Sequence, residues 1–178
     1  MELDNASLAC NYPGTAAVSS IPITAGTNIT AVYLSWLHIV GPMMVWLADC
    51  GSDCRTVDPA KLRWFKIWEA GLLEPPIATG MWFQRAFQNW DGSPDLWTAT
   101  IPENLRAGNY LIRHEIISMH VADQPQWYPE CAHLKVSGKG NRVPSKTYYA
   151  SIPGVYSMSD PSINIDVYTL EKENVTVS

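Results

Sequence analysis

Short apolar segments rich in β-branched and aromatic residues recur along this chain, and turn-forming residues separate them. Such segments are typical of β-strands. The breaks are rich in glycine, proline, asparagine and aspartate, as in Asp91-Gly92-Ser93-Pro94. The predicted strands are Ile29–Trp36, Met43–Ala48, Leu62–Trp68, Leu96–Ile101, Tyr110–Val121, Leu134–Val136 and Ile163–Tyr168. This pattern predicts an all-β antiparallel sandwich, with a short helical turn within Leu72–Asn89 and an ordered loop over Thr147–Pro161.

One segment, Gly108–Cys131, combines strand-like alternation with metal-ligating residue types. If it is extended, one face carries Tyr110, Ile112, His114, Ile116 and His120, and the other carries Leu111, Arg113, Glu115, Ile117 and Met119. Gln126 and Tyr128 flank Trp127 and therefore point the same way, just before Cys131. Such a mixture of side chains indicates a metal site better than it indicates a plain core.

The composition is that of a folded domain with no nucleic-acid or membrane function. With 178 residues and 47% apolar content, the chain can bury one sizeable core, so residues 1–178 are expected to form a single domain. A net charge of -5, without a basic run, excludes a footprint for nucleic-acid phosphates. The apolar run Val40–Ala48 contains Gly41 and Pro42 and is far shorter than the roughly 20 residues of a membrane span.

The chain is rich in aromatic residues, with eight tryptophans and eight tyrosines. Most of them are expected in the sandwich interior. An exposed tyrosine can instead stack on the apolar face of a sugar ring, and Tyr156 is the first candidate for such a substrate contact.

Four cysteines, Cys10, Cys50, Cys54 and Cys131, favour two disulfides over a zinc site, although spacing alone leaves all three pairings open. Glycosylation sequons at Asn5, Asn28 and Asn174 agree with a secretory route. The opening MELDNASLACNYPG nevertheless lacks the basic start and apolar block of a signal peptide. Either the chain stays in the cytosol with reduced cysteines, or the sequence begins downstream of its true start; we favour the second interpretation.

Several motifs, in order, resemble the fungal lytic polysaccharide monooxygenases of auxiliary activity family 9, formerly glycoside hydrolase family 61. They are Cys10-Asn11, His38 before Gly41-Pro42, ADCGSDC, LRWFKIWEAGL, TIPENLRAGNYLIRHEIISMH, QWYPEC and IPGVYSMSDPSINIDVY. The resemblance covers nearly the whole chain from Cys10 to Tyr168. It implies an immunoglobulin-like, fibronectin type III-like antiparallel β-sandwich with long loops around a copper ion.

The resemblance also implies roles for individual residues. The family binds copper through the amine and imidazole of an N-terminal histidine, a second histidine and an axial tyrosine; His38 and Tyr128 match the last two. His120 and Gln126 match the outer pair that hydrogen-bonds to the reacting oxygen. The family's disulfides correspond to Cys10 with Cys131 and Cys50 with Cys54.

Two positions depart from the family pattern. Ile39 and Val40 stand between His38 and Gly41-Pro42, where the family usually has one residue, so the ligand's placement can shift. Met1 stands in place of the N-terminal histidine, which predicts an N-terminally truncated domain that binds copper weakly.

The function implied is that of a secreted, monomeric copper monooxygenase that cleaves β-1,4 bonds in cellulose or a related β-glucan. It would use dioxygen or hydrogen peroxide and an external electron donor, either a small molecule or a redox enzyme. The alternatives are a two-carboxylate hydrolase, a non-catalytic carbohydrate-binding sandwich and an inactive truncated relative. His114 and His133 are expected to be structural, and a cross-strand salt bridge is the ordinary explanation for Arg113 and Glu115.

Overall fold

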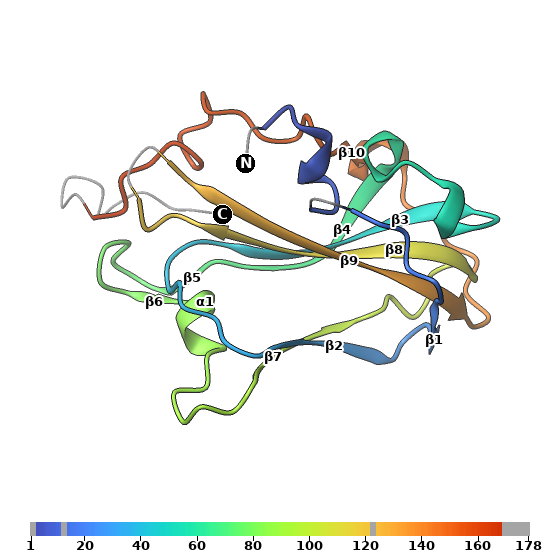
Figure 1. Ribbon diagram of the computed structural model, residues 1–178, viewed down its shortest axis with the longest axis horizontal. Coiled ribbons are helices and arrows are strands. Elements are labelled where there is room, and N and C mark those ends of the chain that lie inside the picture. Colours follow the sequence, from blue (N-terminus) through green and yellow to red (C-terminus); the bar gives the residue numbers. More distant parts are fainter. Residues whose placement is uncertain (1–2, 12–13, 122–123, 169–178) are drawn as a thin grey trace.

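The computed structural model describes residues 3–11, 14–121 and 124–168, which form a layered β-sandwich (Figure 1). The central sheet has the strand order β1 (Ile21–Thr24), β9 (Gln126–Ser137), β8 (Gly108–Ser118), β3 (Met43–Gly51), β4 (Arg63–Ala70) and β10 (Ala150–Ser151). A ribbon of β2 (Asn28–Tyr33) and β7 (Asp95–Thr100) covers one face. A small hairpin of β5 (Leu72–Glu74) and β6 (Met81–Trp82) leads into the helix α1 (Phe83–Ala86). The short 3₁₀ helices are η1 (Ala6–Leu8), η2 (Cys54–Thr56), η3 (Pro59–Lys61) and η4 (Lys146–Tyr148).

The pairing within this sandwich is antiparallel except at one edge, where β1 runs parallel to β9. The sheets are arranged as in an immunoglobulin-like sandwich, so the predicted fold class is confirmed. No helix within the described ranges is long and apolar enough to cross a membrane.

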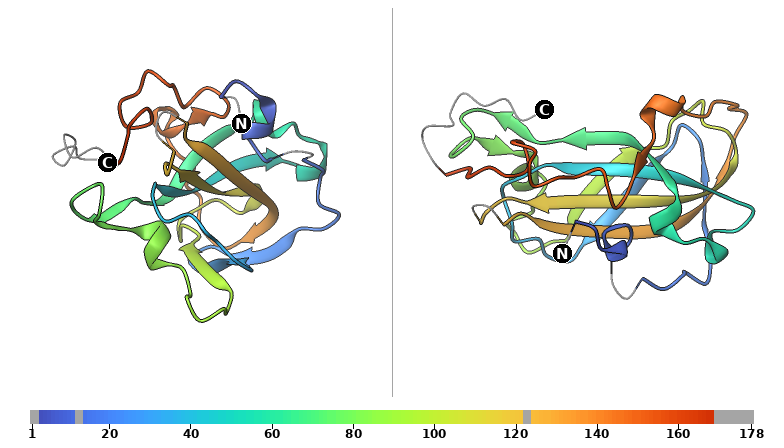
Figure 2. Two further views of the ribbon diagram at one scale, coloured as in Figure 1. Left: turned by 60° about the vertical axis from the view of Figure 1, so that its left-hand side comes forward. Right: turned by 90° about the horizontal axis from the view of Figure 1, so that it is seen from above.

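The central sheet is covered on both faces, which explains why β3 and β8 are almost wholly buried. Tyr110, Ile112 and Ile116 pack toward Trp97 of the β2–β7 ribbon. The opposite face, with Leu111 and Ile117, packs under the N-terminal and C-terminal segments, which cross over the sheet in Figure 2. The two faces predicted for β8 are therefore the two faces observed.

The prediction of a strand at Ile163–Tyr168 is wrong, because this segment forms turns and pairs with no strand in the described structure. Its alternation has another cause. Ile163, Ile165 and Val167 are buried against the outer face of the central sheet. Here the alternation of apolar and polar residues reflects burial of one side of the segment, without backbone hydrogen bonds to a neighbouring strand.

Two disulfides, Cys10–Cys131 and Cys50–Cys54, connect the pairs implied by the family resemblance. The first ties the segment after η1 to β9, and the second closes the turn between β3 and η2. Cys131 lies directly across from Arg113 in the β8–β9 pairing, so the disulfide and Arg113 hold η1 from neighbouring positions.

Arg113 and Glu115 form an ion pair that is completely buried, with Arg113 Nη2 2.7 Å from Glu115 Oε1. It lies along one strand, whereas a bridge between strands was expected. Arg113 also donates to the carbonyl oxygens of Leu8 and Ala9, at 2.8 and 2.7 Å. Glu115 accepts from Trp46 Nε1 at 3.0 Å. These bonds satisfy charges that would otherwise be costly to bury, and they anchor η1 to the sheet.

We expect Glu115→Ala to lower the free energy of unfolding by about 3 to 5 kcal/mol, because it leaves the Arg113 guanidinium buried without its partner. The matched control is Glu69→Ala, which removes the carboxylate of the exposed Lys66–Glu69 pair and is expected to cost at most about 1 kcal/mol. Urea unfolding of the oxidised protein measures both. Equal losses in the two variants would contradict the anchoring role.

Candidate metal centre

The loop between β2 and β3 meets the adjoining ends of β8 and β9 at one end of the sandwich. The loop between β2 and β3 carries His38, the residues after β8 carry His120, and the start of β9 carries Gln126 and Tyr128. His38 Nε2 lies 3.0 Å from the hydroxyl oxygen of Tyr128. The imidazole and phenol predicted to share a metal therefore lie within contact distance of each other.

The two predicted outer residues complete the cluster. The His120 ring stacks on His38, with centroids 4.3 Å apart and planes 21° from parallel. The Tyr128 hydroxyl donates to Gln126 Oε1 at 2.7 Å. Trp36 packs edge-on against both His38 and Tyr128, at centroid distances of 5.2 and 5.0 Å. All four predicted site residues are brought together.

The His38 loop is fixed by a close approach to the end of β8. Met119 N donates to Val40 O, and Ile117 N donates to Pro42 O, each at 3.0 Å. Between these bonds lies Gly41, with φ 126°, where an added Cβ would lie 2.0 Å from Ile117 O. Only glycine fits there. The extra residue before Gly41-Pro42 does not prevent His38 from reaching Tyr128.

Polar residues that the sequence analysis did not single out also hold this loop. Gln88 Nε2 donates to the carbonyl oxygen of His38. Gln84 donates to Ile117 O at 2.7 Å and accepts from Trp36 Nε1 at 3.4 Å. Asp95 accepts from Trp36 N at 2.8 Å. In the sequence, Gln84 and Gln88 are marked only by their i, i+4 spacing in the predicted helical turn. This spacing places them on one helix face but does not identify the groups to which they bond.

Burial sets the protonation of the central pair. It lowers the pKa of the His38 imidazole, with a smaller contribution from nearby His120, and it raises the pKa of the Tyr128 phenol. Neutral imidazole and protonated phenol are therefore the favoured forms at neutral pH. A neutral imidazole has the lone pair that a metal ligand needs.

The separation and the chemistry of His38 and Tyr128 fit two of the ligands of a copper ion. Two ligands about 2 Å from one ion and at right angles lie about 3 Å apart, close to the separation observed. Imidazole nitrogen with an oxygen donor suits copper(II). Across the described ranges, no group of three or more histidine, cysteine, aspartate or glutamate residues could hold a metal.

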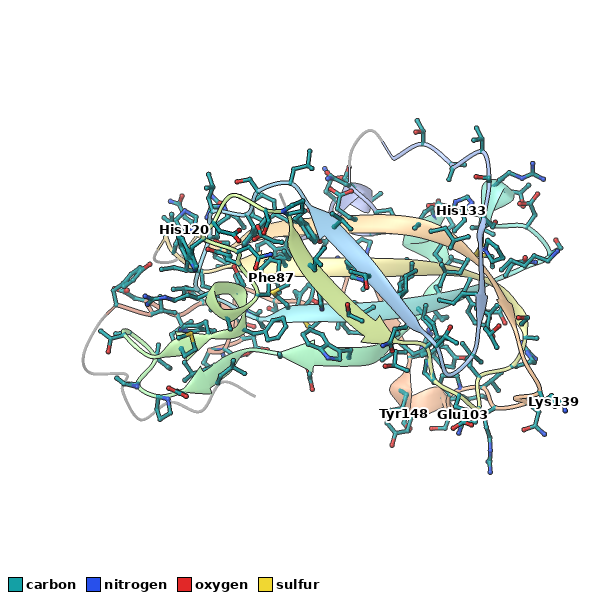
Figure 3. The ribbon with its side chains drawn as sticks, turned by 90° about the horizontal axis from the view of Figure 1, so that it is seen from below. Phe87, Glu103, His120, His133, Lys139 and Tyr148 are labelled. Carbon is teal, nitrogen blue, oxygen red and sulfur yellow. A yellow bond between two sulfur atoms is a disulfide. The ribbon has the colours of Figure 1, made fainter. Side chains whose placement is uncertain are left out.

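The remaining histidines, His114 and His133, lie apart from this cluster. His114 is buried in β8, with its ring edge-on to Trp97 at 4.9 Å. His133 is buried in β9, and Figure 3 shows it far from His120 along the sandwich.

The prediction of Tyr156 as an exposed sugar platform is wrong, because its side chain is half-buried and its hydroxyl donates to Glu115. The sequence signal was a tyrosine in a long loop, but that loop packs on the sheet. Of the predicted glycosylation sites, Asn5 and Asn28 are exposed, and Asn174 lies outside the described residues.

The fold and this cluster define a β-sandwich with a histidine–tyrosine site at one end, and the sequence comparison gives the family. The model of auxiliary activity family 9 (formerly GH61) matches residues 1–176, so the chain belongs to that family. It is 42% identical over 177 residues to AA9 family lytic polysaccharide monooxygenase B of Heterobasidion irregulare, covering 97% of this chain and 71% of that protein. Monooxygenase D of Thermothelomyces thermophilus is 40% identical over 173 residues, covering 93% and 67%.

Solved structures agree with this assignment. The crystal structure of HiLPMO9B superposes with a TM-score of 0.90 and 41% identity, covering 99% of this chain and 79% of that one. A cellulose-active polysaccharide monooxygenase from M. thermophila gives a TM-score of 0.85 and 36% identity, covering 94% and 75%. The predicted class, a copper-dependent lytic polysaccharide monooxygenase, is confirmed at the level of the family.

His114 predicts a pH dependence of stability. Burial lowers its pKa to about 4, so between pH 6.5 and 4 the unfolded chain binds a proton that the folded protein does not. Stability should therefore fall as the pH drops through this window, by about 3 kcal/mol at most from this residue. His114→Phe should remove this part of the slope in urea unfolding curves. Above pH 7 the difference in unfolding free energy between wild type and His114→Phe should stay constant. If the unfolding free energies of the two proteins fell equally steeply below pH 6.5, the assignment of this pH dependence to His114 would be wrong.

Proposed function

We propose that this protein cleaves the β-1,4-glycosidic bonds of cellulose by copper-dependent oxidation. The observation that carries the proposal is the 3.0 Å approach of His38 Nε2 to the Tyr128 hydroxyl, with His120 and Gln126 against the same pair. The cluster is only half-buried at the rim of the sandwich, so core packing alone does not account for its two histidines and its glutamine. We further propose that residues 1–178 act as one catalytic domain and as a monomer.

Each residue of the cluster has a distinct task in this proposal. His38 and Tyr128 would hold copper, and Gln126 orients the Tyr128 hydroxyl through the bond that it accepts. Bound copper would activate dioxygen or hydrogen peroxide with electrons from an external donor. The edge of Trp36 covers His38 and Tyr128 from one side and limits the approach of water. The proposal requires at least one further nitrogen ligand for copper, in addition to the imidazole of His38.

The proposed substrate, cellulose, is a polymer and needs an open surface beside the site. Leu37, directly before His38, is 83% exposed. Trp90 is 74% exposed and lies two residues after Gln88, whose amide contacts the His38 carbonyl. Exposed indole next to the site suits stacking on a sugar ring, so Trp90 takes the role first expected of Tyr156. The relative from M. thermophila described as cellulose-active supports this choice of substrate.

We also propose that the protein is secreted. Both disulfides require an oxidising compartment to form and persist. Asn5 and Asn28 are exposed in their sequons, as N-glycosylation requires.

Product analysis tests the proposed reaction. With copper, a reductant and cellulose, we expect oligosaccharides with oxidised ends in mass spectra, and their loss by 100-fold or more in His38→Ala, because the imidazole ligand is removed. The matched control is His133→Ala, which should keep activity. Reducing ends alone would indicate a hydrolase. Binding without any products, with copper loaded, would indicate a carbohydrate-binding or inactive relative and would overturn the proposal.

Trp90→Ala should weaken binding to crystalline cellulose by about 10- to 150-fold, since burying a large apolar side chain contributes roughly 1.5 to 3 kcal/mol. Tyr148→Ala is the control, because Tyr148 is similarly exposed at 73% but lies at the other end of the molecule from His120 (Figure 3). Pull-down isotherms measure both. If the Tyr148 variant lost as much affinity as the Trp90 variant, the proposed face would be wrong.

A further inference from the structure

A serine hydroxyl lies behind the outer histidine of the candidate site. Ser118 is fully buried at the end of β8, and its Oγ lies 2.6 Å from Nδ1 of His120. In the β8–β9 pairing Ser118 lies directly opposite Gln126, the other outer residue. The hydroxyl is therefore at the base of the cluster, on strands whose positions are fixed by the central sheet.

Burying this hydroxyl carries a cost that its bond to His120 offsets. A buried hydroxyl without a partner destabilises a protein, and alanine would fill the same position without that penalty. In the part of the chain that the structure describes, His120 Nδ1 is the one hydrogen-bond partner of the Ser118 side chain. The other ring nitrogen, Nε2, has no hydrogen-bond partner among the same residues.

The serine proton indicates the direction of this bond. If the imidazole donated to Ser118, the proton of the buried hydroxyl would have no acceptor among the described residues, which is costly. The hydroxyl is therefore the donor. When the serine donates, Nδ1 of a neutral imidazole must be the acceptor, and the ring proton must be on Nε2.

We propose that Ser118 is a positioning residue that fixes the tautomer and the ring plane of His120. Its hydroxyl donates to Nδ1, keeps the proton on Nε2 and holds the ring stacked on His38. His120 thereby presents an N–H donor beside the His38–Tyr128 pair. The tautomer of His120 does not depend on the proposed function. Only the use of its N–H group rests on that function, as a donor to an oxygen-containing reactant at the His38–Tyr128 pair.

The tautomer can be measured directly in the metal-free protein. Long-range ¹H–¹⁵N spectra of histidine-labelled wild type at pH 8 should show the His120 proton on Nε2. In Ser118→Ala the ratio of the Nε2–H form to the Nδ1–H form should fall about fivefold, the effect of losing one ordinary hydrogen bond. Ser118→Thr keeps the hydroxyl and should restore the wild-type ratio. His114 and His133 serve as internal controls whose signals should not change.

Two results would overturn the proposal: a wild-type spectrum with the proton on Nδ1, or an unchanged ratio in a folded Ser118→Ala variant. The first needs no variant, so it remains decisive even if the alanine protein does not fold. Oxidation of cellulose by the copper-loaded proteins is a separate measurement, in which Ser118→Ala should be about 10-fold slower than wild type and Ser118→Thr. If none of the proteins oxidises cellulose, the proposed function fails while the tautomer result still decides the role of Ser118.

Discussion

The approach of the Val40–Pro42 turn to the end of β8 is the constraint on which the candidate site depends. Two backbone hydrogen bonds flank Gly41, and the absence of a side chain lets the turn lie against the Ile117 carbonyl. His38 comes just before this turn, so its ring is held next to His120, which comes just after β8. Tyr128 reaches the same place because β9 pairs with β8 in a fixed register. One close backbone contact and one strand register thus set the geometry of three side chains.

The sheet can hold that geometry because both of its faces are covered. The β2–β7 ribbon packs on one face, and the segments around η1 and the C-terminal loop pack on the other (Figure 1). The second cover has little regular structure of its own. Arg113, Glu115 and the Cys10–Cys131 disulfide attach it to β8 and β9 through buried bonds. A site at the strand ends is therefore supported by a packed core rather than by loops alone.

The sequence could predict those parts of the molecule that depend on local pattern. Apolar segments between turn signals located β3, β8 and most of the sandwich, and the order of motifs located His38, His120, Gln126 and Tyr128. Alternation failed at Ile163–Tyr168, because one-sided burial gives the same pattern with or without a backbone partner. Gln84 and Gln88 could not be recognised, because their partners are backbone carbonyls on distant segments. Such contacts depend on the tertiary fold, and the residue types involved do not indicate them.

The position of the site also bears on the kind of substrate. Cavities of about 320 Å³ lie beside both disulfides and beside Tyr148, but His38 and Tyr128 line neither of them. The cluster lies at a rim, where exposed Leu37 directly precedes His38 and exposed Trp90 follows two residues after Gln88, which bonds to the His38 carbonyl. A small molecule that is to be held tightly needs a concave pocket that removes most of its surface from water. A polymer instead gains affinity from many contacts along an open face. The exposure of Leu37 and Trp90 therefore supports the proposed attack on an insoluble polysaccharide.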